Sequence, residues 1–183
     1  MSNISMTTSK RNAIVTVMLI SAFVSMLNQT ILNTALPAII KGLNITETTA
    51  QWLITGFMLV NGIMIPLTAF LMDKYSTRHL YIFSMAIFLI GSIVAAFSPT
   101  FSILMISRII QAIGAGILLP LMQFTVFTLF PAEQRGFAMG LAGVVVQSAP
   151  AIGPTLTGLF VDLFSWRMPF YLVSAIAAVA FIL

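Results

Sequence analysis

The feature that most constrains this chain is a series of long apolar runs separated by short polar connections. The runs cover residues 13–35, 50–72, 80–97, 101–130, 137–161 and 169–183. A helix of about 20 mainly apolar residues crosses the hydrocarbon core of a bilayer, whereas the connections at 98–100 and 131–136 are too short for a soluble domain. We therefore predict an all-α membrane protein with a polar tail over residues 1–12 and a six-helix bundle over residues 13–183, the last helix being truncated.

Composition excludes several other classes of protein. Hydrophobic residues make up 60% of the chain and charged residues only 7%, whereas about a quarter of a soluble domain is charged. The absence of cysteine excludes disulfides and thiol chemistry, and the single histidine, His79, has no neighbouring metal-ligand pattern. No nucleophile–base pair, phosphate-binding loop or basic cluster is present. We therefore expect neither an enzyme nor a nucleic-acid-binding protein, and we expect no cofactor.

The distribution of basic residues predicts the orientation in the membrane. If the six helices alternate in direction, five basic residues fall on one side: Lys10, Arg11, Lys74, Arg78 and Arg135. Only Lys41 and Arg167 fall on the other side. Lys and Arg are enriched in cytoplasmic loops. We therefore expect a multi-pass protein of the cell membrane with a cytoplasmic N-terminus.

Polar side chains within the apolar runs are the candidate functional residues. Arg108 and Gln111 share one helical face because they are three residues apart. An arginine at such depth costs roughly 2.5–3.5 kcal/mol, which by default indicates a functional site; snorkelling to the headgroups is the alternative. Asn28 lies at a similar depth, and we expect Asn28, Asn33, Arg108 and Gln111 to face one substrate or proton pathway. The alternative for the amides is hydrogen bonding that only joins helices.

Other residues of these two runs have simpler explanations. Ser21 and Ser25 share a face with Asn28, and for the serines we favour hydrogen bonding between helices. Gly114 and Gly116 lie beside Arg108 and Gln111 in the sequence, and their lack of a side chain predicts close approach of a neighbouring helix.

A short sequence pattern occurs twice, on opposite sides of the membrane. Residues 73–78 and residues 162–167 both place Asp, an aromatic residue, Ser and Arg at the same spacing. The first copy follows the second apolar run, and the second copy follows the fifth. Such an arrangement is typical of the inverted three-helix repeats of secondary transporters, although chance agreement is an alternative for so short a pattern.

The fifth run combines glycines with two prolines four residues apart. Small residues allow close helix packing, and prolines remove backbone hydrogen bonds and kink a helix. The residues concerned are Gly136, Gly140, Gly143, Pro150, Gly153, Pro154 and Gly158. We expect Pro150, Gly153, Pro154 and Gly158 to form a hinge or a rocking interface.

Four segments resemble motifs of the major facilitator superfamily, most closely its multidrug proton-antiporter branch with fourteen membrane helices. Residues 108–116 look like the fourth-helix motif, whose arginine is held to take part in proton coupling, and residues 149–158 look like the fifth-helix antiporter motif. Residues 27–37 resemble the first-helix signature, and Ser165-Trp166-Arg167 with Phe170 resembles the loop before the sixth helix. The resemblance covers nearly the whole chain.

The resemblance implies the N-terminal half of a proton-driven exporter of hydrophobic compounds. Its partners would be the bilayer, a small-molecule substrate, protons and a C-terminal half that this sequence lacks. Asp73, Lys74 and Arg78 match a cytoplasmic latch, although Ser76 departs from its usual glycine. Asn28 stands where the family usually has an aspartate, and an amide does not exchange protons near neutral pH. An organic-anion carrier or uniporter of the same fold, and a non-transporting membrane assembly subunit, are therefore alternatives.

Overall fold

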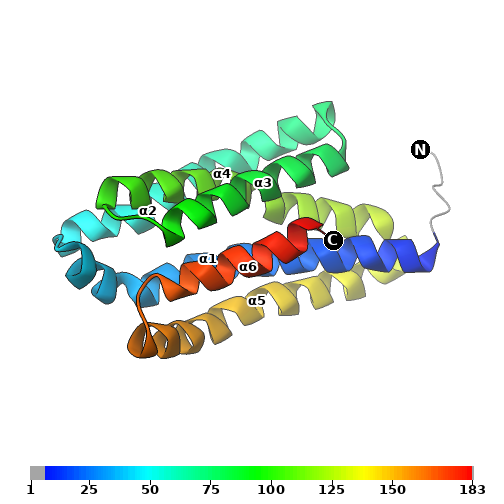
Figure 1. The fold of residues 1–183 in the computed structure, drawn as a ribbon. Helices are drawn as coiled ribbons and strands as arrows, with labels where there is room; N and C mark the ends of the chain where they lie inside the picture. Colours follow the sequence, from blue (N-terminus) through cyan, green and yellow to red (C-terminus); the bar gives the residue numbers. More distant parts are fainter. Residues whose placement is uncertain (1–6, 183) are drawn as a thin grey trace.

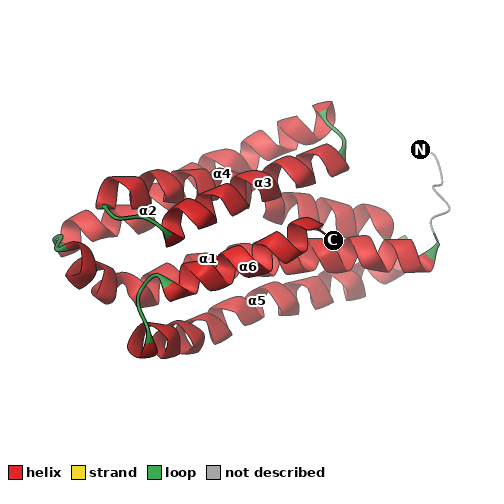
Figure 2. Ribbon diagram, viewed as in Figure 1, coloured by secondary structure: helices red, strands yellow, loops and turns green. Residues whose placement is uncertain are grey.

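The computed structural model describes residues 7–182, and these residues form six α-helices and no strand (Figures 1 and 2). The helices are α1 (Thr8–Leu43), α2 (Glu47–Lys74), α3 (Thr77–Ala96), α4 (Phe101–Leu129), α5 (Ala132–Leu163) and α6 (Met168–Ile182). Helices α1 to α5 are long and apolar enough to cross a membrane, while α6 is shorter at 15 residues. The predicted all-α, multi-pass membrane architecture is confirmed.

Several helices extend beyond the apolar runs from which they were predicted. Helix α1 begins at Thr8, within the expected tail, and continues to a C-cap at Asn44 in the left-handed conformation. The hydroxyls of Thr46, Ser76 and Thr100 accept backbone N–H groups at the starts of α2, α3 and α4. Hydropathy marks the part of a helix that suits the membrane interior, whereas capping groups decide where backbone hydrogen bonding stops.

The first helix of each predicted repeat packs with the other repeat. Helix α4 lies against α2 and α3, and α1 lies against α5 and α6; α1 and α4 also contact one another. Figure 1 shows the two groups, with α2, α3 and α4 above and α1, α5 and α6 below. Helices α1 and α4 thus each pack mainly against the last two helices of the other repeat. This equivalence agrees with two inverted three-helix repeats.

Close approach at glycines joins α4 to its neighbours. A Cβ atom placed on Gly114 would lie 2.6 Å from the Ser84 carbonyl oxygen of α3, and one placed on Gly91 would lie 2.8 Å from the Gln111 backbone nitrogen. Gly116 packs in the same way against α2, because a Cβ atom placed on it would lie 3.2 Å from the Asn61 carbonyl oxygen. The prediction of close helix approach at Gly114 and Gly116 is confirmed.

The glycines of α5 behave differently from one another. Gly153 packs directly against Thr30 of α1. Among the described residues, no atom lies within 4 Å of a Cβ placed on any of four other glycines: Gly136, Gly140, Gly143 and Gly158. Within this bundle, the expectation of close packing along α5 therefore holds at Gly153 and is wrong at the other four glycines. Those four face away from the helices that neighbour α5.

A cluster at one end of the bundle joins three connections. The Arg167 guanidinium donates to the Ser98 carbonyl oxygen at 2.9 Å and lies 4.3 Å from the Trp166 ring. Trp166 is buried and contacts Gly42, where a Cβ atom would collide with the indole. The loop before α6 thereby holds the end of α1 and the α3–α4 connection.

The contact at Gly114 predicts a strong dependence on side-chain size. We expect Gly114→Ala to destabilise the full-length protein by about 1–3 kcal/mol, because the atoms it meets include backbone that cannot rotate away. Gly62→Ala, on the exposed side of α2 with no atom within 4 Å, is the matched control and should be neutral or stabilising by up to about 1 kcal/mol. Thermal unfolding in detergent measures both; equal unfolding temperatures would contradict the close α3–α4 contact.

Candidate functional site

Three helices contribute to one buried network of polar side chains. The Gln111 Oε1 atom accepts from Arg108 Nη1 at 2.7 Å and from Asn28 Nδ2 at 3.2 Å. Gln111 Nε2 donates to Ser92 Oγ at 3.1 Å, and this hydroxyl in turn donates to the Phe88 carbonyl oxygen. All four network side chains, Asn28, Ser92, Arg108 and Gln111, are at most 1% exposed. Gln111 is therefore the residue that joins α1, α3 and α4.

The positive charge of Arg108 is stabilised by the Gln111 amide and by the aromatic ring of Phe57. Its guanidinium carbon lies 4.2 Å from the centroid of the Phe57 ring of α2. All four acidic residues of the chain, Glu47, Asp73, Glu133 and Asp162, are exposed. Buried charges are normally paired, so a cation–π contact and one strong hydrogen bond replace the usual carboxylate here.

Two atoms of the network retain unused hydrogen-bonding capacity. Arg108 Nε and Asn28 Oδ1 are buried and have no hydrogen-bond partner among residues 7–182. One is a donor and the other is an acceptor. An unsatisfied buried polar group costs about 1–3 kcal/mol. A further polar group that bonded to these two atoms would therefore stabilise the network.

Three of the four predicted pathway residues lie together. Asn28, Arg108 and Gln111 are directly hydrogen-bonded, and the burial of Arg108 contradicts the snorkelling alternative. Asn33 is exposed and lies outside the network. Ser92 and Phe57 were not predicted, because a serine and a phenylalanine within apolar runs have no distinguishing sequence signal.

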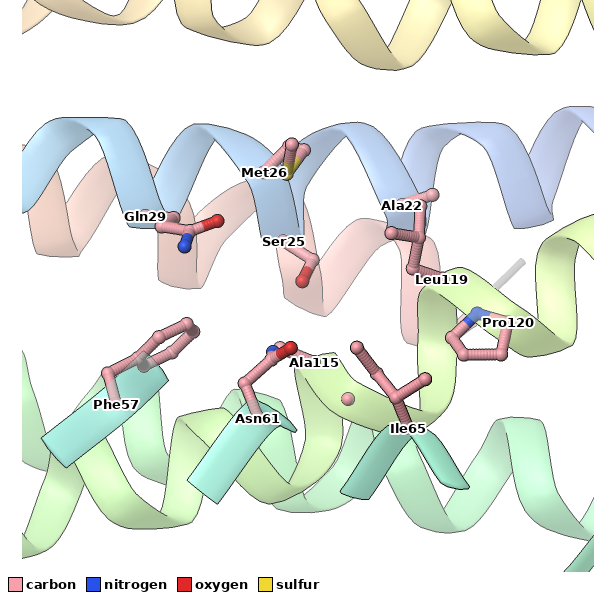
Figure 3. Close-up of a pocket in the computed structure, with 11 residues that line it drawn as sticks. Ala22, Ser25, Met26, Gln29, Phe57, Asn61, Ile65, Ala115, Leu119 and Pro120 are labelled. Carbon is pink, nitrogen blue, oxygen red and sulfur yellow. The ribbon is translucent and has the colours of Figure 1, made fainter. Parts of the chain in front are cut away.

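A small cavity lies between α1, α2 and α4, beside the network (Figure 3). Its volume is about 130 Å³. Its polar side chains are Ser25, Gln29 and Asn61, and no charged residue in the described part of the chain lines it. Phe57 belongs both to the cavity wall and to the contact with Arg108. Asn61 was missed, although an amide within an apolar run is the same signal that identified Asn28.

The candidate latch residues lie at the end of the bundle that contains the α2–α3 connection. Asp73, Lys74 and Arg78 are all exposed. The Lys74 ammonium lies 4.4 Å from the Phe70 ring, and Arg78 borders an apolar cavity of about 680 Å³ between α1, α3, α4 and α6. These side chains are thus accessible to other parts of the protein, and the latch role stays a prediction.

The candidate hinge residues lie within a continuous helix. Pro150 and Pro154 are inside α5, and Gly153 between them contacts α1. Gly158 has open space beside it. The two prolines remove backbone N–H donors from the middle of the helix, which leaves the hinge role as a prediction about motion.

The chain is similar to known proteins in both sequence and structure. The family profile described as Major Facilitator Superfamily matches residues 18–183. The MFS-type transporter YcnB of Bacillus subtilis is 53% identical over 94% of this chain and 37% of its own length. The lincomycin resistance protein LmrB of Bacillus subtilis is 41% identical over 90% of this chain and 36% of its own length.

Two further similarities are more distant. The probable multidrug resistance protein EmrY of Escherichia coli is 35% identical over 80% of this chain and 29% of its own length. A mutant of the peptide transporter POT, crystallised with sulfate, has the same fold with a TM-score of 0.75 at 15% identity, over 90% of this chain and 36% of that one. The chain thus spans about a third of the length of the curated relatives it matches.

The network predicts that Gln111 is needed for stability. Gln111→Leu removes the acceptor shared by Arg108 and Asn28, and we expect a loss of about 3–5 kcal/mol, as when a buried charge loses its partner. Gln111→Glu supplies a carboxylate at the same place and should retain stability. Thermal unfolding of the full-length protein in detergent is the measurement.

The matched control for that experiment is Gln123→Leu, which makes the same change at an exposed position of α4. A surface substitution of this kind should change stability by less than about 0.5 kcal/mol. If Gln111→Leu unfolded at the temperature of Gln123→Leu, Gln111 would not be stabilising the buried arginine.

Proposed function

Because this chain belongs to the major facilitator superfamily, we propose that it forms the N-terminal half of a secondary transporter that exports hydrophobic compounds in exchange for protons. Family membership also means that the chain is not an enzyme. The relatives' names, lincomycin resistance protein and probable multidrug resistance protein, support drugs or similar small compounds as substrates. We place the transporter in the cell membrane with a cytoplasmic N-terminus, from the distribution of basic residues.

The observation that carries this proposal is the buried Arg108 network next to a cavity. Arg108, Gln111 and Asn28 come from the first helix of each inverted repeat and meet where α1 contacts α4. Secondary transporters place their midplane sites at such an interface between repeats. A membrane subunit with only an assembly role would have no need of a buried cation. The anion-carrier alternative is less well supported, because Arg108 lies outside the cavity lining.

Proton exchange calls for a group such as a carboxylate, and no acidic side chain is buried among residues 7–182. Asn28 is an amide, and the acidic residues are all exposed. We propose that a carboxylate from the rest of the full-length protein carries the proton and pairs with Arg108 in one of the transport states. The unpartnered Arg108 Nε atom supports this proposal, since it can donate a further hydrogen bond.

Alternating access would arise from rocking of this half against its counterpart. We propose that Asn33, exposed on α1 beyond Gln29, contributes to the pathway between the halves. The exposed Asp73, Lys74 and Arg78 would form the cytoplasmic latch, and Pro150, Gly153, Pro154 and Gly158 the flexible part of α5.

The proposal predicts that Arg108 is essential for coupled transport. In cells that produce the full-length protein, Arg108→Ala should reduce gradient-driven efflux of lipophilic dyes to the empty-vector level, because the variant lacks the charge that the carrier carboxylate must pair with. Efflux of the uncharged dye Nile red is measured with the proton gradient intact and then collapsed by an ionophore. Membrane insertion, followed by immunoblot of the membrane fraction, should be unchanged.

The control variant is Lys41→Ala, which removes one positive charge at an exposed position at the end of α1. It should transport like the unaltered protein. Normal efflux by Arg108→Ala would remove Arg108 from the mechanism, and efflux that persists after collapse of the gradient would contradict proton exchange.

A further inference from the structure

The small cavity between α1, α2 and α4 holds three polar side chains that have no partner. Ser25, Gln29 and Asn61 make no side-chain hydrogen bond to any other described residue. Ser25 is only 7% exposed, and it points across the cavity toward Asn61 (Figure 3). Gln29 and Asn61 are only partly buried, and the cavity gives other molecules access to all three side chains. They can therefore exchange hydrogen bonds with the polar group of a ligand.

The rest of the cavity wall is apolar and uncharged. Its apolar lining includes Met26, Phe57, Ile65 and Leu119, and no acidic or basic side chain among residues 7–182 lines it. A cationic ligand would find no counter-charge there, and a buried charge without a partner is strongly disfavoured. The lining therefore favours an uncharged ligand over a cation.

Phe57 separates the cavity from the one cation nearby. The ring is 1% exposed and lies 4.2 Å from the Arg108 guanidinium carbon, while the same side chain forms part of the cavity wall. Arg108 is not part of the cavity lining, so an anionic group in the cavity would meet the Phe57 side chain and not the guanidinium. The shielding makes the cavity unsuited to anions as well.

We propose that this cavity binds an uncharged carboxamide or hydroxyl group of an otherwise apolar substrate, with Asn61, Gln29 and Ser25 as its hydrogen-bonding residues. The inference rests on the proposed export function and names the chemical class of its substrate. Amide side chains both donate and accept, so they match a group that does the same. The cavity of about 130 Å³ is smaller than a typical ligand pocket of roughly 300–1,000 Å³. It therefore holds one group of the substrate, and the remainder contacts the rest of the full-length protein.

The test uses three fluorescent coumarins that differ in one substituent: a carboxamide, a carboxylate and a trimethylammonium group. Each is added to the medium around everted membrane vesicles containing the full-length protein, whose cytoplasmic face is outermost, and its uptake into the lumen is followed with the proton gradient imposed. Binding of the same probes to the purified protein is measured separately by fluorescence titration. We expect the carboxamide to be transported and bound at least about tenfold better than either charged probe.

Variants assign this preference to the cavity. Asn61→Leu and Gln29→Leu should each weaken carboxamide binding about three- to tenfold, the effect of losing one hydrogen bond. Gln51→Leu, at an exposed position near the start of α2, is the matched control and should bind normally. Phe57→Ala should increase carboxylate transport, because it uncovers Arg108, while its retained carboxamide binding reports that the variant is folded.

The outcomes separate this inference from the proposed function. Transport of a charged probe equal to or better than the carboxamide would overturn the substrate class while leaving export intact. Carboxamide binding that depends on Asn61 but without transport would support the site and contradict export. Unchanged carboxamide binding in Asn61→Leu and Gln29→Leu, with normal amounts of protein in the membrane, would remove these side chains from recognition.

Discussion

A buried guanidinium without a carboxylate partner is the interaction on which the centre of this structure depends. Arg108 is held by one short hydrogen bond to Gln111 and by the face of Phe57. Both interactions are stronger in a dry interior than in water, and a desolvated cation–π contact is worth about 2 kcal/mol or more. They stabilise the positive charge of Arg108 without neutralising it. The guanidinium can therefore still form an ion pair with a carboxylate from another part of the full-length protein.

The exchanged packing of the two repeats makes this arrangement possible. Gln111 on α4 reaches Asn28 only because α1 and α4 contact one another across the two groups of helices. It reaches Ser92 because the neighbouring residue, Gly91, has no Cβ atom and lets α3 approach the Gln111 backbone. The fold and the network thus depend on the same contacts, and separating α3 from α4 would disturb both.

Phe57 changes how the cavity is understood. From its position in the sequence, Arg108 was compatible with an electropositive pathway for anions. In the structure the ring stands between the guanidinium and the cavity, so the cavity presents amides, a hydroxyl and apolar groups. The guanidinium and the cavity are therefore adjacent but separate, and Phe57 contacts both.

The sequence by itself determined the helices and identified Arg108, Gln111 and Asn28, because hydropathy and helical spacing are local properties that survive any packing. It could not show that Ser92 and Phe57 complete the network, nor that Asn61 faces Ser25, since these residues lie on other helices. It also overestimated the packing along α5, where Gly153 contacts α1 and Gly158 does not. Only the tertiary structure decided these points, because which side of a uniformly apolar helix meets a neighbour depends on packing and leaves no periodic signal.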